Sequence, residues 1–309
     1  MVLQNGAGSR KRVGMSKMEK GSNKGGEYCA RRSGFELRKL VRSILESPDF
    51  EEALKRIDIA PKKMINPMLC CLFETDEVIR WRAVRGVGIT VSAIAETALE
   101  PARTIMRRLI WSLNDESGGI GWGAPEAMGE IMAENEALAR EYYRILISYI
   151  DENGNLLEND ELERGVMWGI NRLAQKRPDL LREWTGPVQA QLKSPDPVKR
   201  GLALRTLLLL AAGASRSVDI LSAARRAAEQ PSLPPVPAPD ADPGAAASLA
   251  RGPGSQALTP LLLSLLEDQS EIRIFQDGSF AEHKISRLAS ELLDLTVSAR
   301  LQFAPVSSA

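Results

Sequence analysis

Apolar residues recur three and four positions apart along most of this chain. In the first such stretch they fall at Phe35, Leu37, Leu40, Val41, Ile44 and Leu45. This spacing gives a helix one buried face, whereas the period-two alternation that marks a strand is almost absent. The pattern therefore predicts an all-α protein.

Polar residues mark where the first helices should begin. Ser33 and Glu36 have the spacing of a capping box, in which a hydroxyl and a carboxylate satisfy free amides at a helix start. Ser47-Pro48 predicts the start of the next helix, since proline is tolerated where no amide hydrogen is needed.

Between about residues 61 and 212 a unit of helix, short polar turn and helix repeats. The first buried residue of each second helix recurs at Ile79, Ile120, Leu162 and Val198, at separations of 41, 42 and 36. Later positions of these helices align as rows in which small residues recur: Ala83, Ala124, Val166, Leu202; Gly86, Ala127, Gly169, Arg205; Gly88, Gly129, Asn171, Leu207. Such a period predicts an α-solenoid, in which stacked helices approach closely at the small residues.

The segments IRWRAVRGVG and IGWGAPEAMG resemble the second helix of HEAT repeats, especially the short kind named after phycobilisome lyases. The segment WSLNDESGGIGWGAPEAMGEI further resembles an uncharacterised group of bacterial HEAT-repeat proteins. The resemblance covers about residues 61 to 212, with a further unit expected near the C-terminus. It implies a HEAT-type fold and a concave side lined by second helices, and it implies no bilin lyase activity.

The solenoid should be interrupted before the C-terminus. Residues 231–256 contain seven prolines, a composition typical of a linker or disordered insertion. A helix is expected from Thr259-Pro260, then a β-hairpin on Asp277-Gly278 that pairs Phe275 with Phe280, Arg273 with Glu282, and Glu271 with Lys284. Ile272, Ile274 and Ala281 then face the final helices, and the hairpin should stand where a repeat turn normally sits. We therefore expect segments at 1–32 (disordered basic tail), 33–228 (repeats), 229–256 (disordered insertion), 257–301 (helix-hairpin-helix cap) and 302–309 (disordered tail).

Formal charge is zero overall but uneven along the chain. Residues 1–33 carry eight basic and two acidic side chains, which predicts a solvated tail with at most weak affinity for nucleic acid. No apolar run approaches the ~18 residues that a membrane helix needs, and no signal-peptide pattern follows the basic segment. Cys29, Cys70 and Cys71 fit reduced thiols, so a cytoplasmic protein without membrane contact is expected.

Catalytic and cofactor chemistry finds little support in the residue types. The single histidine, His283, has no cysteine, histidine or other partner spaced for a triad or a metal site, and the hairpin register places it near Ile272. The His-Glu pairs of metal-dependent HEAT-repeat hydroxylases are absent. We expect no cofactor and no metal, and a binding role rather than an enzymatic one.

A glycine-rich stretch within residues 111–133 has two alternative interpretations beside a flexible turn. Its glycines precede a helix and could cradle phosphate, but neither nucleotide-binding glycine pattern is matched. Asn114, Asp115 and Glu116 could hold a divalent cation through oxygen atoms, although EF-hand spacing is missing.

The strongest candidate site comes from two columns of the repeat alignment, one helical turn apart. The first column reads Trp81, Trp122, Arg164, Arg200 and the second Arg85, Glu126, Trp168, Leu204. The resemblance would place both on the concave side, where exposed tryptophan is typical of recognition. The predicted site thus comprises Trp81, Arg85, Asn114, Asp115, Glu116, Trp122, Glu126, Arg164, Trp168 and Asn171, with Glu126 as charged anchor.

Three interpretations of these two columns remain open. A scaffold that binds a protein or peptide is the main hypothesis. HEAT-like DNA glycosylases also line a concave face with Trp, Arg and carboxylate to hold distorted DNA, but the near-neutral charge of the repeats argues against phosphate binding. The third interpretation is packing alone, with Trp between repeats and an ion pair between Arg85 and Glu126. Oligomeric state is not predicted.

Overall fold

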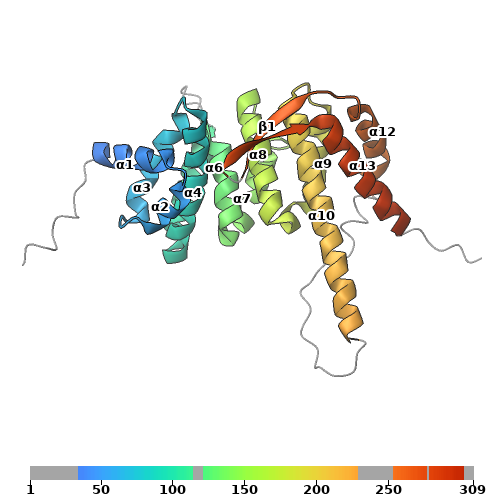
Figure 1. Cartoon of the computed structure of the whole chain (residues 1–309), viewed down its shortest axis with the longest axis horizontal. Helices are drawn as coiled ribbons and strands as arrows, with labels where there is room; N and C mark the ends of the chain where they lie inside the picture. Colours follow the sequence, from blue (N-terminus) through green and yellow to red (C-terminus); the bar gives the residue numbers. More distant parts are fainter. Residues whose placement is uncertain (1–33, 114–120, 229–252, 277, 303–309) are drawn as a thin grey trace, which may run out of the picture.

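The computed structural model describes residues 34–113, 121–228, 253–276 and 278–302 (Figure 1). The N-terminal helices are α1 (Gly34–Glu46), α2 (Phe50–Arg56), α3 (Pro61–Cys70), α4 (Glu77–Thr97) and α5 (Leu99–Leu113). The central part consists of α6 (Ala124–Glu134), α7 (Glu136–Ser148), α8 (Asp160–Lys176), α9 (Thr185–Ala190) and α10 (Pro197–Ala228), with short 3₁₀ turns at Cys71–Phe73, Pro178–Trp184 and Gln191–Lys193. The C-terminal part consists of α12 (Pro253–Leu265), β1 (Glu271–Gln276), β2 (Ser279–Lys284) and α13 (Ile285–Gln302).

The second helices of the repeats form one row. α4 packs on α6, α6 on α8, and α8 on α10, while α3, α5 and α7 pack along the row in an outer layer. Figure 1 shows this stack advancing from α4 to α10 along the long axis of the molecule. The predicted all-α fold, an α-solenoid of HEAT/armadillo type with one short β-hairpin, is confirmed.

Small residues allow the second helices to pack closely on one another, as the alignment predicted. A Cβ atom built on Gly129 of α6 would lie 2.3 Å from the Cα atom of Gly169 in α8. The residues four positions after the first aligned residue of each second helix are buried, as in Ala83, Ala124 and Val166. The core is therefore continuous along the stack rather than gathered at one centre.

The second helices begin at side-chain caps. Asp76 and Asn159 each accept a hydrogen bond from the backbone amide three residues on, at Ile79 and Leu162, with N···O distances of 3.1 Å. These amides lack partners within the helix, so an Asp or Asn just before the first buried residue fixes where the helix starts. The predicted start at Ser47-Pro48 is wrong by a few residues, since α2 begins at Phe50 after Asp49, whose carboxylate accepts from the Ser47 hydroxyl.

The glycine-rich repeat departs from the alignment. Gly123 has a φ of 74°, a left-handed conformation that favours glycine, and α6 begins directly after it at Ala124. Ile120 lies outside the described residues, and Trp122 lies in the turn before the helix rather than within it. The expected helical position of Trp122 is therefore wrong, because a right-handed helix cannot extend through Gly123 in its left-handed conformation to the residues before it.

The C-terminal hairpin has the predicted pairing, and it also covers a surface that the sequence did not indicate. Phe275 pairs with Phe280, Arg273 with Glu282, Glu271 with Lys284, and His283 with Ile272, so the register is confirmed. The hairpin connects α12 and α13, which pack on each other, so it stands at the turn of the last helix pair as predicted. From there it crosses the row of second helices over α8 (Figure 1). Ile272 is buried against Gly201 of α10. The helix before the hairpin also begins earlier than expected, at Pro253, with Pro260 inside it.

Among the described residues, no helix is both long enough and apolar enough to cross a membrane.

Candidate functional site

The face of the helix row that the hairpin crosses, here called the inner face, carries a repeated pattern of side chains. In α4 Trp81 is followed four residues later by Arg85, in α6 Glu126 by Glu130, and in α8 Trp168 by Arg172. Residues four apart lie one above the other on a helix. Parallel stacking of the helices then brings two tryptophans together at one level and aligns the charged residues at the next.

The tryptophan level forms an aromatic cluster with the hairpin. The rings of Trp81 and Trp168 have centroids 4.8 Å apart, and Phe275 of β1 stacks on Trp81 at 5.5 Å with an interplanar angle of 11°. The Trp168 Nε1 atom donates a 3.1 Å hydrogen bond to the Phe275 carbonyl oxygen. Trp168 is consequently only 8% exposed, so the expectation that it is open to solvent is wrong: a segment 107 residues away in sequence covers it.

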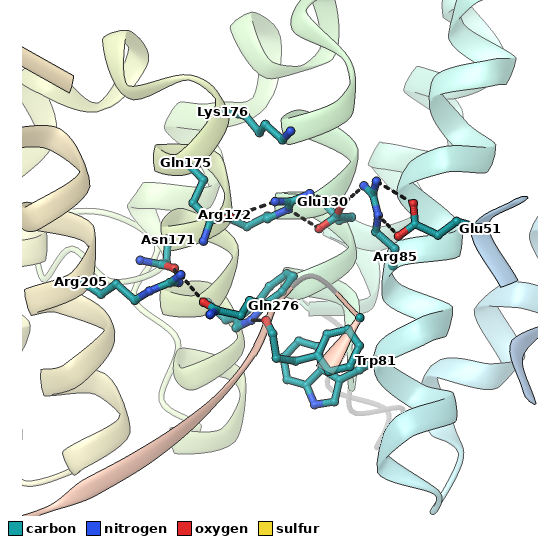
Figure 2. Close-up of a pocket in the computed structure, with 13 residues that line it drawn as sticks. Glu51, Trp81, Arg85, Glu130, Asn171, Arg172, Gln175, Lys176, Arg205 and Gln276 are labelled. Atoms are coloured by element: carbon teal, nitrogen blue, oxygen red, sulfur yellow. Dashed lines mark hydrogen bonds and ion pairs between the residues drawn. The ribbon is translucent and has the colours of Figure 1, made fainter. Parts of the chain in front are cut away.

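The charged level is an ion-pair network centred on Glu130. This carboxylate has 2% of its side chain exposed and accepts from Arg85 and, at 2.8 and 3.0 Å, from Arg172 (Figure 2). Arg85 also binds both carboxylate oxygens of Glu51, at 2.9 and 3.1 Å, and contacts Glu134. Burial by itself lowers the pKa of the Arg85 guanidinium, but these carboxylates outweigh burial and raise it. Each guanidinium is therefore held in place by charge.

Between the two levels lies a cavity of about 350 Å³, here called the inner cavity. Asn171 borders it and accepts from Arg205 while donating a 3.1 Å bond to Thr206, and Arg205 also bonds the side chain of Gln276 at the hairpin tip (Figure 2). Trp81, Phe275 and Trp168 close its apolar side. The lining is Glu51, Trp81, Arg85, Glu130, Trp168, Asn171, Arg172, Gln175, Lys176, Arg205, Phe275, Gln276 and Gly278.

A second, smaller hollow of about 50 Å³ lies beside Trp81 and is lined also by Trp122, Glu126, Glu161 and Arg80. The Glu126 Oε2 atom is buried without a hydrogen-bond partner and lies where a Cβ on Gly165 would be 2.6 Å away. Burial raises the pKa of Glu126 to about 7, against the opposing effects of its own backbone amide and Arg80. Glu126 is thus a desolvated carboxyl group in a notch between helices.

The predicted site residues separate into groups. Trp81, Arg85, Trp168 and Asn171 line the inner cavity, and Trp122 and Glu126 line the small hollow with Trp81. The predicted Arg85–Glu126 ion pair is wrong, because Arg85 pairs one turn further along α6 with Glu130.

Arg164 has a structural role instead. It pairs with Asp196 at 2.5 Å and with Glu161, so it ties α8 to the start of α10. Leu204, from the same columns, is fully buried. Asn114, Asp115 and Glu116 lie outside the described residues.

Sequence reasoning missed Glu130, Arg172, Arg205 and Phe275. Glu130 and Arg172 could have been found by extending the two alignment columns one more turn, to the i+4 neighbours of Glu126 and Trp168. Phe275 could not, because nothing in a hairpin sequence states which distant surface it covers. Within the described parts of the chain, no cluster of three or more His, Cys, Asp or Glu side chains could hold a metal ion.

Comparison with known proteins gives partial likenesses. No protein-family profile matches the chain. An uncharacterized protein from Archaeoglobus fulgidus is 32% identical over 119 residues, which span 38% of this chain and 56% of that protein. The chain thus matches only about half the length of this relative.

Three solved structures match over most of the chain, each with a TM-score below 0.5. A computationally designed armadillo repeat protein for modular peptide recognition has a TM-score of 0.43 at 15% identity, over 84% of this chain and 92% of that one. The archaeal HEAT-like repeats protein from Thermococcus onnurineus NA1 has a TM-score of 0.35 at 16% identity, over 87% and 98%. An engineered protein has a TM-score of 0.46 at 14% identity, over 87% and 94%.

Proposed function

We propose that this chain is a repeat scaffold whose inner cavity binds a segment of a protein or peptide partner. One observation carries the proposal: an open cavity of about 350 Å³ in which charged side chains, already held by one another, meet an aromatic wall. Fixed charges beside apolar rings give a partner both orientation and desolvated contact area without a cost of ordering.

The chemistry of the lining favours an acidic segment. Arg85, Arg172, Lys176 and Arg205 outnumber the carboxylates that line the cavity, Glu51 and Glu130. Lys176 is exposed at the rim, where a carboxylate of the partner can reach it. The arrangement is less suited to a DNA backbone, since phosphate binding needs an extended excess of positive charge. Here three glutamates neutralise Arg85 and Arg172, so the excess is confined to Lys176 and Arg205.

Two finer points belong to the same proposal. We assign the repeats to the phycobilisome-lyase-like kind on the strength of the segment IRWRAVRGVG, with no lyase activity implied. We also propose a cytoplasmic location, because Cys70 and Cys71 are free thiols of the kind that a reducing compartment maintains.

The test uses a charge reversal with a matched control. Lys176→Glu changes the rim of the cavity, whereas Lys193→Glu makes the same change at an exposed lysine outside it. Partners captured by the wild type are identified, purified and titrated against both variants by calorimetry. We expect Lys176→Glu to bind at least tenfold more weakly than the wild type, and this difference should be larger at low salt. Lys193→Glu should bind with wild-type affinity. Equal affinity of both variants for every partner would refute the cavity as the site.

A further inference from the structure

The β1–β2 hairpin binds the inner face in the way a separate peptide would. Phe275 is 5% exposed, its ring stacks on Trp81, and its carbonyl oxygen accepts from Trp168. Both contacts use features that any extended strand with an aromatic residue possesses, namely a flat ring and a main-chain carbonyl. The hairpin therefore shows what kind of ligand this surface accepts.

Alternate residues of β1 contact α10 and α4. Toward α10, Ile272 near the open end of the hairpin is buried against Gly201, and Gln276 at its tip bonds Arg205. Over α4, it is held by the Phe275 ring and by an ion pair between Arg273 and Glu77 at 3.7 Å, whose side chains are 56% and 45% exposed. Exposed ion pairs contribute little, so attachment over α4 depends on the ring.

Docking of the hairpin also leaves polar atoms without partners. Trp81 Nε1 and His283 Nε2, on β2, are both buried and make no hydrogen bond. If detachment exposes these atoms, water satisfies them, so their burial then opposes the docked state. A ligand that offered an acceptor to Trp81 Nε1 would bind better than the hairpin does.

We propose that the Trp81–Trp168 surface is a recognition site for an extended strand that carries an aromatic side chain, and that the hairpin is its intramolecular occupant. The incoming ring replaces Phe275 on Trp81, and the incoming main chain accepts from Trp168. The site shares the aromatic wall of the inner cavity but differs in chemistry, because it uses ring stacking and a main-chain hydrogen bond rather than the charged side chains. It therefore goes beyond the charge-based recognition proposed for the cavity, and its test does not depend on Lys176.

Hydrogen exchange of the full chain tests whether the hairpin detaches. Amides of β1 should exchange at least tenfold faster than those in the middle of α8, and Phe275→Ala should speed their exchange about tenfold more. Phe280→Ala is the matched control, because that ring contacts Phe275 and Arg273 while Phe275 keeps its place on Trp81. If β1 exchanges as slowly as α8 in the wild type and in Phe275→Ala, the proposal is wrong. Should Phe275→Ala fail to fold, Phe275→Leu, which keeps an apolar side chain but loses the flat ring, takes its place.

A labelled peptide of residues 271–284 then tests the site itself by fluorescence anisotropy. It should bind the Phe275→Ala chain at least tenfold more tightly than the wild type, whose site is occupied, while the same peptide with Phe275→Ala should bind neither. Binding should persist in the Phe275→Ala/Lys176→Glu chain, which separates this site from the inner cavity. A released hairpin with no peptide bound, or binding indifferent to the peptide's phenylalanine, would overturn the assignment.

Discussion

Glu130 is the residue on which the charges of the inner face converge. Its carboxylate lies between Arg85 of α4 and Arg172 of α8, so one side chain of α6 links three successive repeats. A buried carboxylate is tolerated only when its hydrogen bonds are satisfied, and two guanidiniums satisfy this one. The network therefore holds the cavity wall in shape as well as charging it.

We predict that Glu130→Gln destabilises the fold by roughly 1 to 3 kcal/mol, since the two arginines keep Glu51 and Glu134 but lose their shared buried partner. Urea denaturation followed by circular dichroism measures the loss. The control is Glu136→Gln, which removes an exposed partner of Arg140 and should leave the unfolding midpoint unchanged. Equal effects of the two substitutions would show that the buried network contributes no more to stability than an exposed ion pair.

Glu126 gives the molecule a predicted pH dependence. Because burial raises its pKa to about 7, the folded chain retains between pH ~4.5 and ~7 a proton that the unfolded chain has released. Stability should therefore fall as pH rises through this window and stay lower above it. We expect Glu126→Gln, which mimics the protonated form, to stabilise the fold by roughly 1 to 3 kcal/mol at pH 8 and to change little at pH 4.5. Melting curves at both pH values check this, and equal shifts at the two would contradict it.

At the scale of elements, the close approach of α6 and α8 sets how far the stack can compress. We predict that Gly129→Ala destabilises the protein by about 3 kcal/mol, because the added methyl group meets the backbone of Gly169, which cannot rotate away. Gly186→Ala in α9 is the matched control: nothing lies within 4 Å of its Cβ position, so stability should stay constant or rise slightly. Thermal melts of both variants distinguish a local steric clash from a general cost of replacing glycine by alanine.

The proline-rich segment before α12 carries an element-scale prediction from composition. Since α12 begins at Pro253, the replaced segment should end before it, at residue 251 rather than at 256. A short Gly-Ser linker in place of residues 231–251 should leave the melting temperature nearly unchanged, because the segment has no helical apolar pattern. A broad, less cooperative transition would show that these residues pack.

At the scale of the whole molecule, the charge is divided among a basic N-terminal segment, near-neutral repeats and an acidic C-terminal part. We predict weak, salt-sensitive nucleic-acid binding that disappears when residues 1–32 are deleted, because its strength depends on displaced counterions rather than on a shaped surface. Fluorescence anisotropy with a labelled duplex at two salt concentrations measures it. Tight, lesion-selective binding that survived the deletion would instead support the glycosylase alternative.

The sequence alone determined the helices, the repeat and the hairpin register, because each depends on neighbours within a few residues or on one repeat length. The period and the small-residue rows predicted that α6 and α8 approach closely, although the structure sets Gly129 against Gly169 and not against Asn171 of its own row, and pairing of side-chain types aligned Phe275 with Phe280. Only the tertiary structure decided that Phe275 covers Trp81, that Arg85 chooses Glu130 over Glu126, and that Glu126 is left desolvated. Helical spacing states which residues share a face, but it does not state which face lies opposite, and contacts across 45 or 107 residues depend on how the whole stack is packed.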